Sequence, residues 1–148
     1  MGHVPQDPVR AEGEGAHLQR RERRGTSAAR VVGKSLAAQS RGRFGEEQAL
    51  RWYNQRGYSL IARNWRCPIG EIDLILTAAH LVVFCEVKAR ASEEFGGPQA
   101  AVGWHKQRRL RRLAAMWLAE FRPAGRVDVR FDVAAVVGAR VTVIEAAF

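Results

Sequence analysis

Four charged side chains interrupt two apolar runs near the middle of the chain, where ionised groups are costly to bury. In chain order they are Glu71, Asp73, Glu86 and Lys88. Two carboxylates on adjacent strands can hold a hard, oxygen-seeking cation such as Mg²⁺, which keeps several waters for a reaction. A lysine beside them can lower the pKa of an attacking water or stabilise charge that develops on a phosphate. This combination is what hydrolysis of a phosphodiester requires.

Side chains alternate between the two faces of a strand, which decides whether these four residues can meet. The alternation puts Glu71 and Asp73 on one face of the first strand. It puts Glu86 and Lys88 on one face of the second. If the hairpin between the strands brings those faces together, three carboxylates and one ammonium converge. The alternative is a buried ion-pair network, which neutralises charge without chemistry and is the commoner explanation for any one of these residues alone.

Hydrophobic periodicity predicts a single α/β domain with the element order α-β-β-β-α-β-β. An amphipathic helix is expected from Gly33 to a stop at Gly57, and a second from Pro98, which suits a first helical turn, to the "RPAG" at 122–125. The expected strands cover 58–66, 69–77, 81–89, 128–138 and 141–147. The domain is therefore assigned to residues 33–148. Residues 1–32, rich in Gly, Pro, Arg and Glu, are expected to be a disordered basic tail.

The composition favours a polyanionic partner, because 24 Lys and Arg against 15 Asp and Glu give a formal charge of +9. Nucleic acid is the usual candidate, since each phosphate contact releases condensed counterions. Cys67 and Cys85 lack the spacing of a zinc site or a disulfide framework and are expected to be core residues in a reducing compartment. No segment reaches the roughly 18 apolar residues of a membrane span, and no signal peptide is visible. We therefore expect a cytoplasmic protein without a membrane partner.

Basic residues of the second predicted helix are candidates for nucleic-acid contact. Lys106, Arg108 and Arg109 follow a Gly-rich turn, and a solvated basic helix face is the alternative explanation. Arg63 is a further candidate for a phosphate contact. The four tryptophans are expected in the core rather than as base-stacking platforms; they are Trp52, Trp65, Trp104 and Trp117. Asp132 also lies within a strand, and an ion pair with Arg130 explains it without chemistry.

Asp73 followed by Glu86-Val87-Lys88 resembles the PD-(D/E)xK nuclease signature. The wider ordered set resembles the YraN family of bacterial proteins over residues 33–137. Its segments are "GEEQAL", "GY", "RNWR", "GEIDLI", "VFCEVK", "FGGPQAAV" and "HKQRRL". That family is similar to restriction-endonuclease-like nucleases and, among them, to archaeal Holliday junction resolvases. The resemblance implies a mixed sheet flanked by helices, with the metal site on the sheet.

The resemblance also implies roles for individual residues. Asp73 and Glu86 match the metal-binding acids, and Lys88 matches the catalytic lysine. Glu46 of "GEEQAL" matches a helix-borne glutamate that joins the metal site in such resolvases, and the main-chain carbonyl of Val87 would be a further ligand. Glu71 has no assured counterpart. The proline of the signature is missing, since Ile72 precedes Asp73.

The expectation is therefore a Mg²⁺-dependent endonuclease, with Mn²⁺ as a substitute, that hydrolyses DNA phosphodiesters, with branched or junction DNA as one candidate substrate. Junction resolvases act as dimers, so a homodimer is considered, although no residue specifies a two-fold interface. The first alternative is a nucleic-acid-binding protein on the same fold without turnover. The second is a structural or assembly protein in which the acids only form ion pairs.

Overall fold

The computed structural model describes residues 26–91 and 102–148, with side chains in the first helix described from Leu36 onward. By its internal contacts the chain divides into Met1–Lys34 and Ser35–Phe148. The fold and the site below belong to the second of these units. In the described residues, no helix is both long and apolar enough to cross a membrane.

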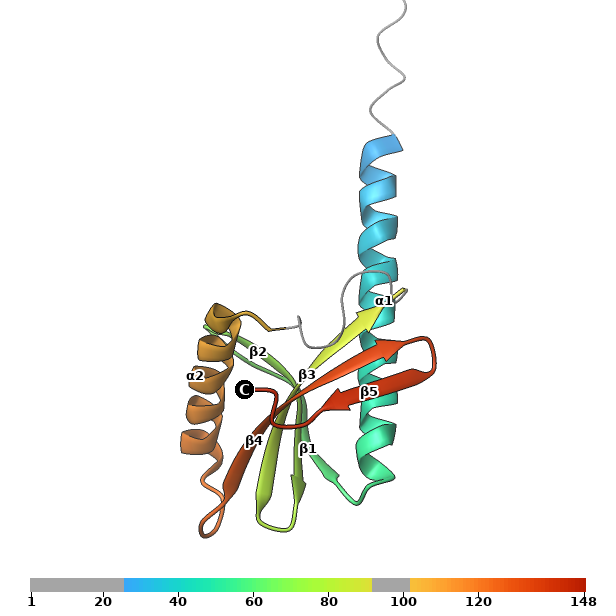
Figure 1. Cartoon of the computed structure of the whole chain (residues 1–148). Coiled ribbons are helices and arrows are strands. Elements are labelled where there is room, and N and C mark those ends of the chain that lie inside the picture. Colours follow the sequence, from blue (N-terminus) through green and yellow to red (C-terminus); the bar gives the residue numbers. More distant parts are fainter. Residues whose placement is uncertain (1–25, 92–101) are drawn as a thin grey trace, which may run out of the picture. The chain divides into compact units, whose positions relative to one another are not determined.

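The described residues form two helices and five strands in the predicted order (Figure 1). Their bounds are α1 Thr26–Asn54, β1 Ser59–Cys67, β2 Gly70–Ala78, β3 Leu81–Arg90, α2 Trp104–Phe121, β4 Asp128–Val137 and β5 Arg140–Ile144. The strands form one sheet in the spatial order β1-β2-β3-β4-β5, in which β3 and β4 are parallel and the other neighbours antiparallel. The predicted α/β class, with a mixed sheet flanked by helices, is confirmed.

The first helix starts earlier than the sequence pattern indicated. α1 begins at Thr26, so residues 26–32, which were predicted to be part of a disordered tail, are helical. That stretch holds alanine and arginine, which favour helix, and no glycine or proline. Residues 1–25 lie outside the described residues, and the disorder predicted for them stays a prediction. At the other end Gly57 has a φ of 84°, a left-handed conformation that suits the predicted glycine stop.

The second helix starts later than expected, at Trp104. The carbonyl of Gly103 accepts the first helical hydrogen bonds, from the N–H groups of Lys106 and Gln107. Val102 precedes the helix but still packs against the hydrophobic cluster under α2. Its apolar character therefore indicated a buried position and not a helical one. Pro98 lies outside the described residues. The helix ends at Phe121, and its C-cap residue Arg122 has a left-handed backbone.

The two helices lie on opposite sides of the sheet (Figure 1). A hydrophobic cluster lies between the sheet and each helix. The cluster under α1 consists of Ala49, Tyr53, Leu74, Leu76, Val83, Cys85, Ala134 and Val136. The cluster under α2 consists of Ile72, Ile75, Val82, Phe84, Leu110, Leu113, Ala114 and Trp117. Both cysteines are free, as predicted, and Cys85 is fully buried. The sheet thus carries a buried apolar layer on both sides, so charged groups near β2 and β3 lie against low-dielectric surroundings.

Candidate active site

The pairing of β2 with β3 stops where the charged residues begin. It runs from Ala78 opposite Leu81 to Leu74 opposite Cys85, and it does not continue to Asp73 and Glu86. Beyond this point the Asp73 carboxylate takes part in the contact between the strands: its Oδ2 accepts a hydrogen bond from the Val87 N–H at 2.7 Å. A side chain therefore bridges the two strands where they diverge.

The alternation of side chains along β2 is irregular at the same point. Ile72 and Ile75 both pack under α2, although three positions separate them, while Leu74 packs under α1. The strict alternation that placed Glu71 beside Asp73 is therefore wrong here. Glu71 is exposed and its Oε2 lies 2.9 Å from Arg66 Nε in a surface ion pair. Such pairs contribute little, and Glu71 has no described contact with the other acids.

Two ammonium groups share the Glu86 carboxylate, which is only 9% exposed. Lys88 Nζ, on the same strand, lies 3.0 Å from Glu86 Oε1. Lys106 Nζ, from the first turn of α2, donates a hydrogen bond to the same oxygen. The expected meeting of Glu86 with Lys88 therefore occurs, and Lys106 joins the site from another element.

The Asp73 carboxyl carries the electrostatic signature of a crowded acidic site. The pKa of Asp73 is raised to about 6, mainly by burial and next by the negative charge of Glu86, with a smaller contribution from Glu46. The hydrogen bond from the Val87 N–H opposes this shift. A carboxyl group that titrates near neutral pH because of burial and a like-charged neighbour is typical of functional sites.

The two lysines differ in how readily they release a proton. Burial lowers the pKa of Lys106. Burial acts in the same direction on Lys88, but the hydrogen bond and the negative charge of Glu86 act against it, and the pKa of Lys88 is raised. The two lysines contact the same carboxylate oxygen, so the protonation of one depends on that of the other.

Glu46 approaches the site from α1 but is held by other partners. Its Oε2 accepts hydrogen bonds from Arg63 Nε at 2.8 Å and from Asn64 Nδ2 at 2.9 Å. Arg63 also contacts Glu47 at 3.3 Å and the Arg43 carbonyl at 3.0 Å. In this structure Arg63 therefore ties β1 to α1 through Glu46, and the phosphate contact proposed for it stays a prediction.

Gly45 packs closely against the strand that carries the site, although the family resemblance gave it no role. A Cβ at Gly45 would lie 2.6 Å from the Cβ of Ala89 and 3.5 Å from Cγ1 of Val87. The absence of a side chain lets α1 pack directly on β3 beside the Glu86-Val87-Lys88 segment, and it places Glu46 one residue further along the helix. The sequence signal was a glycine inside a helix, which costs about 0.5–1 kcal/mol relative to alanine and so calls for a packing reason.

Asp73 and Glu86 can bind a divalent cation as two acids, without Glu46 as the third that the resemblance implied. Within residues 26–91 and 102–148, no group of three or more His, Cys, Asp or Glu side chains is arranged to hold a metal ion. Mg²⁺ is commonly held by one or two carboxylates together with waters and substrate phosphate. Asp73 and Glu86 supply that donor chemistry, whereas Glu46 is engaged by Arg63 and Asn64. The metal, and the ligand role of the Val87 carbonyl, stay predictions.

Comparison with known proteins shows that the site lies within a segment matched by a family model. The model of a family described as "Uncharacterised protein family UPF0102" matches residues 45–136. The chain belongs to the UPF0102 family. This is the YraN family that the motifs resemble, so that prediction is confirmed. The UPF0102 match extends from Gly45 to Val136 and thus contains all the proposed site residues.

Curated UPF0102 proteins from several bacteria are similar over most of their length. The one from Beutenbergia cavernae is 50% identical over 99 residues, which cover 67% of this chain and 83% of the relative. The one from Parafrankia sp. is 48% identical over 100 residues, covering 67% and 83%. The one from Moorella thermoacetica is 44% identical over 102 residues, covering 69% and 84%.

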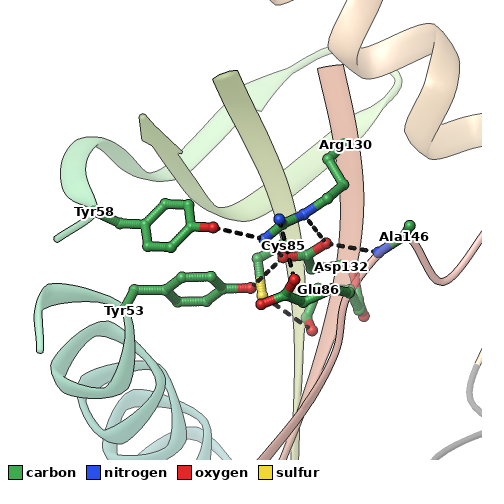
Figure 2. A network of polar contacts seen from close by, with 8 residues as sticks. Tyr53, Tyr58, Cys85, Glu86, Arg130, Asp132 and Ala146 are labelled. Carbon is green, nitrogen blue, oxygen red and sulfur yellow. Dashed lines mark hydrogen bonds and ion pairs between the residues drawn. The ribbon is translucent and has the colours of Figure 1, made fainter. Parts of the chain in front are cut away.

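A second buried carboxylate in this UPF0102 protein has a structural role. Asp132, 1% exposed, accepts hydrogen bonds from the Tyr53 hydroxyl at 2.8 Å, from Arg130 at 2.7 and 2.8 Å and from the Ala146 N–H at 3.0 Å (Figure 2). Arg130 NH2 also donates to the Tyr58 hydroxyl at 3.1 Å. The predicted ion pair between Arg130 and Asp132 is confirmed. It ties the end of α1 to β4 on the α1 face of the sheet.

The remaining basic candidates lie on the outside of α2. Arg108 and Arg109 are exposed, so both are available to solvent, and their contact with nucleic acid stays a prediction. Trp104 departs from the expected core position, since it is 58% exposed at the first residue of the helix. Trp117, in contrast, is buried as expected.

Proposed function

We propose that this UPF0102 protein is a Mg²⁺- or Mn²⁺-dependent endonuclease that hydrolyses DNA phosphodiesters. The supporting observation is the divergence of β2 and β3 at Asp73 and Glu86, with Lys88 Nζ 3.0 Å from Glu86. A purely structural sheet would be more stable if backbone pairing continued and apolar side chains replaced buried ions. Here the chain keeps an acid with a pKa of about 6 at the break.

Each residue has a distinct part in this proposal. Asp73 and Glu86 are the groups that would hold the cation, which supplies Lewis acidity toward the phosphate and a more acidic bound water. The Val87 N–H fixes the position of the Asp73 carboxylate through its 2.7 Å hydrogen bond. Lys88 presents a positive charge beside Glu86 that would orient the attacking water and stabilise charge on the phosphate in the transition state.

The substrate class follows from charge. The formal charge of +9 favours a polyanion, and Arg108 and Arg109 lie exposed on the helix that carries Lys106 to the site. Phosphate contacts from such residues position a nucleic acid without reading its sequence. The charge favours a nucleic acid as the substrate, and the resemblance of Asp73 and Glu86-Val87-Lys88 to the PD-(D/E)xK signature favours DNA, with cleavage directed by its structure rather than its sequence.

One observation favours a second candidate, a nucleic-acid-binding protein without turnover. The Glu86 carboxylate is already neutralised by two ammonium groups, from Lys88 and Lys106. A site that used such ion pairs only for stability would bind phosphate through its basic residues and have no need of a metal. Cleavage assays separate the two candidates.

The test uses the full-length chain with four-way junction, single-stranded and duplex DNA, each in Mg²⁺, Mn²⁺ or EDTA. We expect metal-dependent cutting that Lys88→Ala reduces by about 10²- to 10⁴-fold, the range for loss of a transition-state group, with DNA binding retained. Glu86→Gln should abolish cutting. Glu71→Gln is the matched control, since it removes an acid from β2 that pairs only at the surface.

The outcomes discriminate between the candidates. Wild-type protein that binds DNA but never cuts any substrate in either metal would leave only the non-catalytic binder. Equal losses in Glu71→Gln and Glu86→Gln would show that the assay reports total charge rather than the site. Absence of salt-dependent DNA binding would exclude both candidates.

A further inference from the structure

A tryptophan and an arginine lie together on the outside of α2. Trp104 is 58% exposed, and the guanidinium of Arg108 lies over its indole ring, 5.7 Å from the centroid. The His105 ring also lies against the indole, with 3.4 Å between the ring centroids and 30° between the ring planes. Trp117, at the other end of the same helix, is by contrast buried and packs edge-on against Phe84. A large aromatic ring left in solvent forgoes the stabilisation of burial, so its position invites a functional explanation.

The first turn of α2 places this pair next to the candidate active site. Lys106, two residues after Trp104, reaches the Glu86 carboxylate. Leu110 and Leu113 lie on the same face of α2 as Lys106, and both are buried. Trp104 and Arg108 occupy a different face of the same turns. The ring therefore stands at the solvent side of the helix end that contacts Glu86.

The neighbours of Trp104 indicate what kind of ligand it accepts. Arg108 and Arg112 follow at intervals of four residues and are exposed, so an indole and two guanidinium groups form one ridge that advances about 6 Å per step. Met116, four residues after Arg112, is also exposed, but the two arginines separate it from Trp104. A docking surface for an apolar protein segment would place apolar side chains next to one another. An aromatic ring followed by cations instead matches single-stranded nucleic acid, whose bases stack and whose phosphates pair with arginine.

We propose that Trp104 and Arg108 form a stacking platform for an unpaired base of the bound DNA. The faces of a base inside a duplex are covered by its neighbours, so only an unpaired or extruded base can stack on the ring. The inference rests on the proposed nuclease function and narrows its substrate to DNA that carries unpaired nucleotides. Fully paired duplex would bind through phosphate contacts alone.

The test measures binding in EDTA, where no cutting occurs, by fluorescence anisotropy of a single strand and of the matching duplex. Trp104→Ala should weaken single-strand binding by about 5- to 150-fold, the equivalent of one base stack, and leave duplex binding nearly unchanged. Trp104→Phe should retain most of the affinity. Met116→Ala, which removes another exposed apolar side chain from α2, is the control and should change neither. A 2-aminopurine in the single strand should be quenched by wild type and not by Trp104→Ala.

The outcomes distinguish this inference from the proposed function. If wild type cuts DNA but Trp104→Ala binds both substrates as wild type does, or loses both equally, the platform is overturned and the nuclease stands. If the single-strand effect occurs without any cutting, the platform stands and the nuclease falls. If wild type binds neither the single strand nor the duplex, the platform and the nuclease are both overturned. The same result is expected if Trp104 docks a protein instead.

Discussion

The Asp73 carboxylate accepts a hydrogen bond from the Val87 N–H, at 2.7 Å, across the gap where β2 and β3 stop pairing. This contact holds the Asp73 carboxylate beside the Glu86-Val87-Lys88 segment, where regular backbone pairing between the two strands has ended. It also couples the ionisation of Asp73 to the stability of the sheet at that point, because one proton decides whether the bridging group is charged.

Replacing Asp73 with asparagine should stabilise the protein at alkaline pH in EDTA. The pKa of Asp73 is about 6 in the folded chain, against 3.8 without perturbation, so the folded state binds this proton more tightly than the unfolded state. Stability from this group is therefore present below about pH 4 and lost as pH rises through about 6. Asp73→Asn should gain up to about 3 kcal/mol above that window and nothing below it.

The measurement is urea unfolding of wild type and Asp73→Asn at a series of pH values. Glu71→Gln, an exposed acid on the same strand, should show no such pH-dependent gain. A stability difference between wild type and Asp73→Asn that stays constant across the series would contradict the raised pKa.

Gly45→Ala should destabilise the fold although alanine favours helix. The new Cβ would meet the Cβ of Ala89 at 2.6 Å, so α1 must shift away from β3. We expect a loss of about 1–3 kcal/mol in the free energy of unfolding, as for overpacked cores. Gly42→Ala is the control in the same helix; nothing lies within 4 Å of its added Cβ, so it should gain about 0.5–1 kcal/mol. If both variants changed the free energy of unfolding in the same direction, the close approach of α1 to β3 at Gly45 would be refuted.

Tyr53→Phe should weaken the fold through the buried Asp132. The Tyr53 hydroxyl donates to Asp132 at 2.8 Å, and its removal leaves a carboxylate that is 1% exposed with one partner fewer. The expected loss is about 1–3 kcal/mol, measured by thermal or urea unfolding. Tyr58→Phe is the comparison, because that hydroxyl accepts from Arg130 in a partly exposed position. It should cost less; an equal or larger cost would contradict the burial argument.

Lys106→Ala should strengthen binding of Mn²⁺ to the full-length chain. The Lys106 ammonium occupies Glu86 Oε1, an oxygen that a cation would use, so the two compete for one carboxylate. We expect about tenfold tighter binding by calorimetry, the effect of removing one neighbouring positive charge. Arg112→Ala removes the same charge from an exposed position on α2 and should change the affinity little. Weaker binding in Lys106→Ala would mean that the lysine supports the cation site.

The sequence by itself determined the element order, the sheet partners of the central hairpin and the acids within it. Two apolar runs separated by the short segment "AAH" made β2 and β3 predictable, since both signals are local. The structure shortens the turn to Ala79 and His80, because Ala78 still pairs with Leu81. The pattern of acids and lysine around Glu86 was likewise visible, because charges are rare in buried strands. The Arg130–Asp132 pair was predictable for the same reason, being two residues apart on one strand.

Only the tertiary structure decided which side chains meet. The separation of β2 from β3 at Asp73 depends on how the strands twist, and strict alternation therefore misplaced Glu71. The pairing of Lys106 with Glu86 and of Arg63 with Glu46 each joins residues far apart in the chain, which no local periodicity specifies. The exposure of Trp104 follows from where α2 begins, because the first residue of a helix can face solvent even when the helix itself is packed on a sheet.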